Sequence, residues 1–367
     1  MPDFRKILIV KLSSMGDVLH ALPAVPFLRE AAPKAEIHWA VDTRFAELLE
    51  GNPGIAKVVS LPIREWKGRP ASPSTWREAR IAAESLRGGR YDLAIDLQGN
   101  IKSGVVTYLS GAPLRYGFPR EAARERQNLW FTNRRPPSVE EDRHVTEKIL
   151  RVASAPFGGT FRLDDLKGEI SIPPVEIAAA ERLLSETLPG ACPRLAVHPG
   201  TTWNTKRMDA SFWADTVRIV RDIFPGVGVF LSWGTEKERE ECRAIRYLAG
   251  EGVALLPRLG YKALAAAYRA CGHMLGPDTG PLHLAAVVGA KTVSVFRGSD
   301  GRYAAPVGPG HRFFQAPLPC TACQIKGDKV CPRDAECRAT IKAAEVAAAV
   351  ADSMGGPGAA AAGEAAR

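Results

Sequence analysis

Short, mainly apolar runs alternate with helical stretches along most of this chain, and that alternation limits the possible folds more than any other feature. The runs lie at 6–10, 37–41, 58–61, 91–97, 195–197, 227–231, 253–256, 271–275 and 291–296. Runs with so few polar residues are typical of parallel strands covered on both faces. Strands that alternate with helices predict an α/β protein with doubly wound parallel sheets.

The strands fall into two series, which predict two domains. With 367 residues, 46% of them hydrophobic, the chain can form two cores. A polar, proline-containing stretch around 164–174 indicates a linker. We therefore expect one Rossmann-like domain over 1–170 and a second over 171–353, whose final helix can pack back on the first. An Ala/Gly-rich tail, 354–367, is predicted to be disordered. A cleft between the two domains is the expected ligand site.

The segment 276–283, Gly-Pro-Asp-Thr-Gly-Pro-Leu-His, joins an expected strand to an expected helix. Backbone N–H groups at a helix N-terminus favour an anion there. Asp278, Thr279 and His283 add groups that can bind sugar hydroxyls or phosphate oxygens. The segment predicts a site for the diphosphate and ribose of a nucleotide-sugar, and an ordinary capped turn is the alternative.

Two other strand ends carry polar side chains. Asp17 follows the first strand, at the start of a helix. It can be a ligand-facing residue at the carboxyl edge of the sheet or a simple N-cap. The loop 198–207 is rich in hydroxyl groups and cations. Its composition suits phosphate, although it does not end in the G-K-[ST] of a P-loop.

The chain is basic, with a net charge of +9, which favours anionic partners. Arg64, Lys67 and Arg124 belong to cationic stretches of the first half. Arginine binds carboxylate and phosphate in a bidentate manner, so these stretches predict a cradle for an anionic acceptor. A solvated charged surface is the alternative. No nucleic-acid module is recognised, so nucleic acid is not an expected partner.

Neither a spanning segment nor a signal peptide is expected. No apolar run reaches the ~18 residues that cross a bilayer, and the first residues lack the pattern of a cleaved signal. The sequence therefore predicts a cytoplasmic protein.

Four cysteines, spaced C-x2-C-x7-C-x5-C, come late in the chain. They are Cys320, Cys323, Cys331 and Cys337. Four such residues can hold a structural zinc ion or an iron–sulfur cluster. The unequal spacing weakens that match, and reduced thiols or one bonded pair are the alternatives.

Five segments together resemble the heptosyltransferases of glycosyltransferase family 9, which have the GT-B fold and act in lipopolysaccharide inner-core synthesis. They are 9–20, 96–103, 198–206, 233–238 and 278–283, in the family's order. The first of them and the basic stretch 64–69 look most like the heptosyltransferase I branch. The resemblance implies two Rossmann-like domains that face each other across a cleft.

The resemblance also implies an activity: inverting transfer of L-glycero-D-manno-heptose from ADP-heptose to the Kdo-lipid A acceptor. Asp17 would be the general base. Other family roles fall on residues of this sequence as follows: Thr201, Thr202, Lys206, Thr279 and Gly280 on the diphosphate, Glu238 on the ribose, Asp278 and His283 on the heptose or phosphates, and Arg64, Lys67 and Arg124 on the acceptor. These cationic and hydroxyl groups would offset the charge on leaving ADP, so no catalytic metal is expected.

A lipid acceptor implies peripheral association with the cytoplasmic face of the inner membrane. The sequence departs from the family branch in two places: Phe296-Arg297-Gly298-Ser299 replaces Tyr-Gly-Pro-Thr, and Leu259 replaces a methionine of the adenine pocket. These departures leave the sugar and the acceptor open. The alternatives are another GT-B enzyme acting on a nucleotide-sugar, such as an epimerase, or a non-enzymatic anion-binding protein. An epimerase would make little use of the arginine-rich loops.

Overall fold

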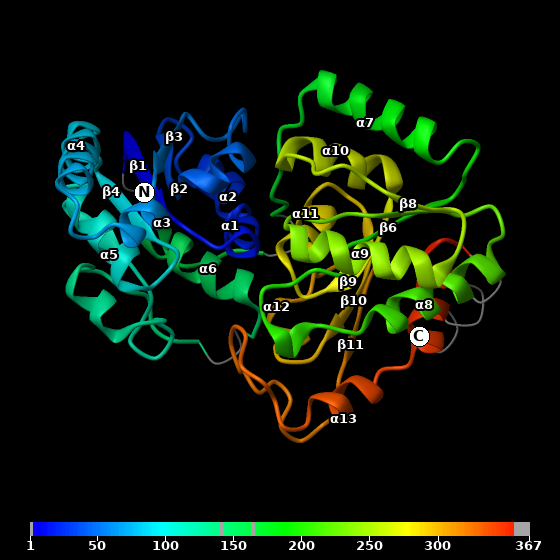
Figure 1. Cartoon of the computed structure of the whole chain (residues 1–367). Coiled ribbons are helices and arrows are strands. Elements are labelled where there is room, and N and C mark those ends of the chain that lie inside the picture. The colour runs from blue at the N-terminus through cyan, green and yellow to red at the C-terminus, as the bar shows by residue number, and fades with distance from the viewer. Residues whose placement is uncertain (1–2, 140–142, 163–165, 356–367) are drawn as a thin grey trace. The chain divides into compact units, whose positions relative to one another are not determined.

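The computed structural model describes residues 3–139, 143–162 and 166–355, and the chain divides into two compact units, Met1–Ser171 and Ile172–Arg367 (Figure 1). Each unit contains one parallel sheet with helices on both faces, so the predicted α/β class with two doubly wound sheets is confirmed. The cleft between them stays a prediction. The predicted tail lies outside the described residues from 356 onward.

The sheet of unit 1 has the order β3-β2-β1-β4-β5. Its strands are β1 Lys6–Val10, β2 Glu36–Asp42, β3 Lys57–Leu61, β4 Leu93–Asp96 and β5 Leu114–Tyr116. β1 lies between β2 and β4, and Ile9 is paired with both Trp39 and Ile95. Four apolar side chains of β1 are fully buried, as expected for a central strand. The chain leaves β1 toward β2 and leaves β4 toward β5. The loops after β1 and β4 therefore diverge at a topological switch point, where open α/β sheets bind ligands.

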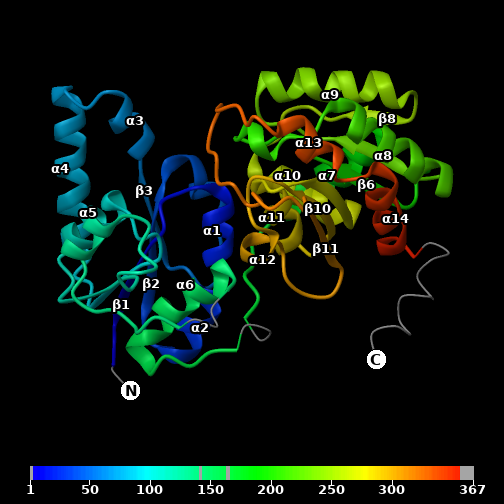
Figure 2. The ribbon, with the colours of Figure 1, turned by 90° about the horizontal axis from the view of Figure 1, so that it is seen from below.

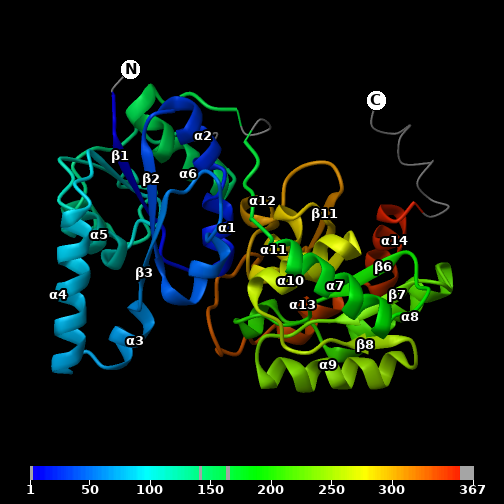
Figure 3. The same cartoon turned by 90° about the horizontal axis from the view of Figure 1, so that it is seen from above.

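Helices cover both faces of this sheet (Figures 2 and 3). One face carries α1 Met15–Ala21, α2 Ala24–Ala31 and α6 Val145–Ser154, and the other carries α4 Pro73–Gly88 and α5 Ile101–Leu109. Shorter elements are η1 Thr43–Leu48, α3 Ile63–Gly68, η2 Arg126–Trp130 and η3 Ala155–Phe157. The basic stretch 64–69, expected as a loop, is therefore mostly the short helix α3.

The sheet of unit 2 has the order β11-β10-β9-β6-β7-β8. Its strands are β6 Arg194–Val197, β7 Gly228–Leu231, β8 Val253–Leu255, β9 His273–Pro277, β10 Lys291–Phe296 and β11 His311–Gln315. The sequence predicts β10 as the last strand, and that is wrong, because β11 pairs in parallel along the whole of β10. The switch point of this sheet lies between β6 and β9, so the loops after these two strands can reach a common ligand.

Helices again pack on both faces of this sheet. They are α7 Pro174–Thr187, α8 Ala210–Ile223, α9 Glu236–Ala249, α10 Tyr261–Cys271, α11 Gly280–Val287 and α14 Ala343–Ser353, with η5 Asn204–Lys206, α12 Gly301–Ala304 and α13 Asp334–Ala339 as short additions. α14 packs on α8, β9 and β10 of its own unit, and the expected packing of this helix on the first domain stays a prediction. No described helix is long and apolar enough to cross a membrane.

Candidate active site

Asp17 lies in the first turn of α1, and the N-cap of that helix is Ser14 instead of Asp17. Asp17 takes part in the same capping box, because its carboxylate accepts a hydrogen bond from Ser14 N at 3.0 Å. Its carboxylate also forms an ion pair with Arg124 and lies 3.9 Å from Lys11 Nζ. The side chain is 17% exposed, while that of Lys11 is 2% exposed. Asp17 is therefore part of the capping box and also a charge that solvent can reach, held between two cations.

Electrostatics keep this carboxylate ionised. Burial raises the pKa of Asp17, but the positive charges of Lys11 and Arg124 outweigh burial and hold that pKa well below its usual range. Burial lowers the pKa of Lys11 to about 8, against the attraction of Asp17. The pair therefore presents an anionic oxygen at neutral pH, which a general base requires.

The loop that precedes Asp17 is fixed by the loop after β4. Gln98 Oε1 accepts from Leu12 N at 2.7 Å and from Ser13 N at 3.0 Å. Lys11 Nζ donates to Leu97 O at 2.7 Å. The sequence marks Asp96–Gly99 as a family segment without a role for it. The structure shows that Gln98 holds the loop that leads to Asp17 in place.

A buried carboxylate in turn holds the Gln98 loop. Asp96 accepts from Gln98 N at 2.9 Å, from Gly99 N at 3.0 Å and from Ser103 Oγ at 2.8 Å. Burial raises the pKa of Asp96, and these hydrogen bonds oppose that rise. The position of Asp17 thus depends on interactions that originate in the central strands β1 and β4.

The three residues expected to bind the acceptor substrate, Arg64, Lys67 and Arg124, lie in different surroundings. Arg124 contacts Asp17 directly. Arg64 and Lys67 lie exposed on α3, which has no buried residue. The structure thus joins one of the three to the candidate base and leaves the other two on a solvent-facing helix.

Asp278 is the centre of a polar cluster in unit 2, at the end of β9 and beside the N-terminus of α11. Its carboxylate forms an ion pair with Lys206, accepts from Ser299 Oγ at 2.6 Å and lies 3.3 Å from His283 Nε2. Thr201 Oγ1 donates to Asp278 O at 3.2 Å. Burial raises the pKa of Asp278, but His283 and Lys206 outweigh burial and lower it well below its usual range.

This cluster changes the interpretation of Asp278. The sequence suggests that Asp278 binds the heptose or phosphates, but in the structure its carboxylate oxygens already contact protein groups. Its observed contacts orient Lys206 and His283. Thr202, Thr279 and Gly280 are less buried than Asp278, and Gly280 is the first residue of α11. The sequence did not identify Ser299 as part of this cluster.

Glu238 lies close to the 198–202 loop. Its Oε2 accepts from Gly234 N at 2.8 Å and from Thr235 N at 2.9 Å, which caps α9. A Cβ on Gly200 would lie 2.5 Å from Glu238 Cδ. The loop can therefore approach Glu238 this closely only because residue 200 is glycine.

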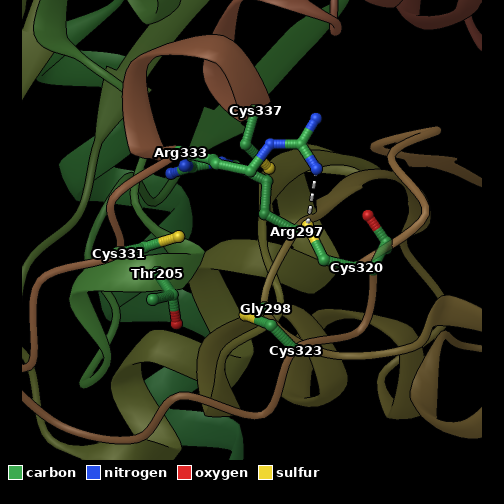
Figure 4. A pocket seen from close by; sticks show the side chains of 9 residues that line it. Thr205, Arg297, Gly298, Cys320, Cys323, Cys331, Arg333 and Cys337 are labelled. Atoms are coloured by element: carbon green, nitrogen blue, oxygen red, sulfur yellow. Dashed lines mark hydrogen bonds between the residues drawn. The ribbon is translucent and has the colours of Figure 1, made fainter.

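The four late cysteines line one small pocket in unit 2 and are not disulfide-bonded (Figure 4). Within the described part of the chain, no three His, Cys, Asp or Glu side chains are arranged to hold a metal ion. The metal predicted from their spacing is therefore unconfirmed.

A family model agrees with the segments noted in the sequence. Residues 80–332 match the model of "Glycosyltransferase family 9 (heptosyltransferase)". The chain belongs to glycosyltransferase family 9. The predicted family and the predicted enzyme class, a glycosyltransferase, are confirmed. This membership supports neither an epimerase nor a non-enzymatic anion-binding protein.

Individual members of glycosyltransferase family 9 are similar over most of the chain. Lipopolysaccharide heptosyltransferase 1 of Pseudomonas aeruginosa is 33% identical over 88% of this chain and 86% of the relative. The structure of "E. coli heptosyltransferase WaaC with ADP-2-deoxy-2-fluoro heptose" has a TM-score of 0.69 at 26% identity, covering 85% of this chain and 93% of that one. E. coli heptosyltransferase II shares the fold, with a TM-score of 0.73 at 19% identity, covering 95% and 98%.

Proposed function

We propose that this family 9 enzyme transfers L-glycero-D-manno-heptose from ADP-heptose to a Kdo-lipid A acceptor. The observation that carries the proposal is the similarity to lipopolysaccharide heptosyltransferase 1 over 88% of the chain. A second support is the WaaC structure, which resembles this one and contains an ADP-heptose analogue.

Unit 2 would bind the donor. Lys206 lies with its ammonium 4.1 Å from the centroid of the Trp203 ring and beside Asp278, so its position is restricted on two sides. The ammonium, the hydroxyls of Thr201, Thr202 and Thr279, and the backbone N–H of Gly280 would contact the diphosphate. Glu238 would bind the ribose. Asp278 would act by orienting Lys206 and His283, which would contact the phosphates or the heptose.

Unit 1 would bind the acceptor and supply the base. Asp17 would take the proton from the acceptor hydroxyl while that oxygen attacks the anomeric carbon opposite ADP. The bond from that carbon to the phosphate oxygen then breaks, and its electron pair leaves with ADP, so the anomeric configuration inverts. Arg124, Arg64 and Lys67 would contact the carboxylates and phosphates of the acceptor.

Charge that develops on ADP would be stabilised by Lys206 and by the N-terminus of α11. Transfer would then need no metal ion. Because the acceptor is a lipid and the chain carries a net charge of +9, we also propose that the enzyme works at the cytoplasmic face of the inner membrane.

The proposal is tested by incubating the protein with ADP-heptose and Kdo2-lipid A and following the product by mass spectrometry, with and without EDTA. Parallel reactions contain GDP- and UDP-sugars. We expect addition of one heptose, unchanged by EDTA, and none with Asp17→Asn. Transfer only from another nucleotide-sugar would refute the donor, and near-normal turnover of Asp17→Asn would refute the base.

A further inference from the structure

The four-cysteine segment, residues 320–337, has its thiols around one cavity (Figure 4). Cys323, Cys331 and Cys337 are partly buried and Cys320 is exposed. The cavity is small, with room for one water molecule or one ion and too little for an organic cofactor.

Two guanidinium groups lie at the same cavity. Arg297 is 2% exposed, and Arg333 Nη1 lies 3.8 Å from Cys320 Sγ. Among the described residues, Arg297 Nε and Thr321 Oγ1 are buried atoms without a hydrogen-bond partner, which is an uncommon state for buried polar atoms. Four thiolates around a divalent ion carry a net charge of about −2. The two guanidinium groups would offset part of that charge, because Arg297 also pairs with Asp334 and Arg333 also pairs with Glu336.

The segment also supports the donor loop. Thr205 Oγ1 donates to Ile325 O at 2.7 Å, Asn204 N donates to Gly327 O at 3.0 Å, and Asn204 Nδ2 donates to Asp328 O at 2.9 Å. The three acceptors lie between Cys323 and Cys331. The backbone immediately before Lys206 is therefore held by the part of the chain that the cysteines enclose.

Arg297 connects the residue after Lys206 to the cysteine segment. Its guanidinium donates to Arg207 O, and to Asp334 O at 3.0 Å and Asp334 Oδ1 at 2.6 Å. Gly298 N donates to Thr205 O at 3.1 Å and Gly298 O accepts from Gln324 N at 3.0 Å. Arg297 and Gly298 belong to the stretch that departs from the family branch.

We propose that the four cysteines bind one divalent metal ion as thiolates, of the type that zinc forms, and that the bound ion holds residues 320–337 in the conformation that supports Lys206. Binding releases the thiol protons to solvent. Among the described residues the thiols line the cavity without converging on one point, so binding would require their side chains to rotate toward the ion. The ion takes no part in the chemistry of transfer, since its ligands are all protein thiolates.

The first measurement is the metal content and the free-thiol count of the unmodified protein, purified without chelator. We expect about one metal ion per chain. Cys323→Ser and Cys331→Ser are expected to lose the ion, while Cys192→Ser, which changes an exposed cysteine outside the segment, keeps it. A metal content far below one per chain, or two disulfides in place of the thiols, overturns the metal site.

The second measurement is the affinity for ADP, followed by calorimetry on folded, metal-loaded and metal-depleted protein. This readout rests on the proposed donor site, whereas the metal content does not, so the two failures are distinguishable. We expect depletion to weaken ADP binding about tenfold, because small displacements of a binding group have effects of this order or larger. Unchanged ADP affinity after loss of the ion overturns the coupling. A Cys variant that fails to fold leaves the measurements on the unmodified chain decisive.

Discussion

The charge of Lys11 can be tested as the cause of the low pKa of Asp17. Lys11→Met keeps the length of the side chain and removes the charge that lies 3.9 Å from Asp17 Oδ1. At an effective dielectric constant of about 20, that charge contributes about 4 kcal/mol, or about 3 pKa units. The carboxylate is 17% exposed, and water screens part of the interaction. We therefore expect the pKa of Asp17 to rise by about 1 to 3 units.

The assay is a carboxyl ¹³C NMR titration, with the Asp17 resonance assigned from its absence in Asp17→Asn. Lys6→Met is the matched control, because Lys6 begins β1 and Lys11 directly follows that strand, but Lys6 pairs with Glu36 and is 38% exposed. The acid limb of kcat/KM should move upward with the pKa in Lys11→Met only. An Asp17 pKa that is the same in Lys11→Met and the wild type, or that shifts equally in Lys6→Met, would refute the electrostatic argument.

Three further predictions concern other contacts of the two clusters. Gln98→Ala leaves two backbone N–H groups without their acceptor, which should cost about 1–3 kcal/mol in urea denaturation and lower kcat; equal stability of mutant and wild type would contradict this. Gly298→Ala brings a Cβ inside van der Waals contact of Thr205, so ADP binding should weaken, and unchanged calorimetric affinity would count against it. Asp278 has a depressed pKa, so its contribution to stability is full above the unfolded pKa of about 3.9 and is lost as pH falls further; Asp278→Asn should flatten that part of the stability curve, and an equally steep curve would disprove it.

Strong local patterns made some elements predictable. β1 is five consecutive residues with four fully buried apolar side chains, and its run could be identified without tertiary information. α5 has no strong helix signal in the sequence, because Gly104, Val105, Val106 and Thr107 have low helix propensity. Gly104 is required there, since a Cβ would lie 2.7 Å from Phe131 Cδ2. β11 is a short edge strand that contains Arg312 and shows no apolar alternation.

The places of the candidate site residues in the fold could be predicted from the sequence, but the side chains that they contact could not. Asp17 and Asp278 both follow the carboxyl end of a strand, and the predicted order of strands and helices is enough to place them there. Their partners come from far along the chain: Arg124 is 107 residues from Asp17, and Lys206 is 72 residues from Asp278. Local spacing carries no information on such pairs. The sequence therefore suggested Asp278 as a ligand of the heptose or phosphates, without revealing that its carboxylate contacts Lys206, His283 and Ser299.

Helix α3 differs from the rest of unit 1 in one respect that bears on evolution. It has no buried residue, whereas Asp17 depends on groups in the central strands β1 and β4. Exposed positions such as Arg64 and Lys67 can change at about 0.5 kcal/mol or less, while changes at Gln98 or Asp96 disturb the core. As the chain evolves, Arg64 and Lys67 can therefore be replaced at little cost in stability, and selection there would act on the proposed acceptor contacts, whereas replacements around Asp17 would also cost stability.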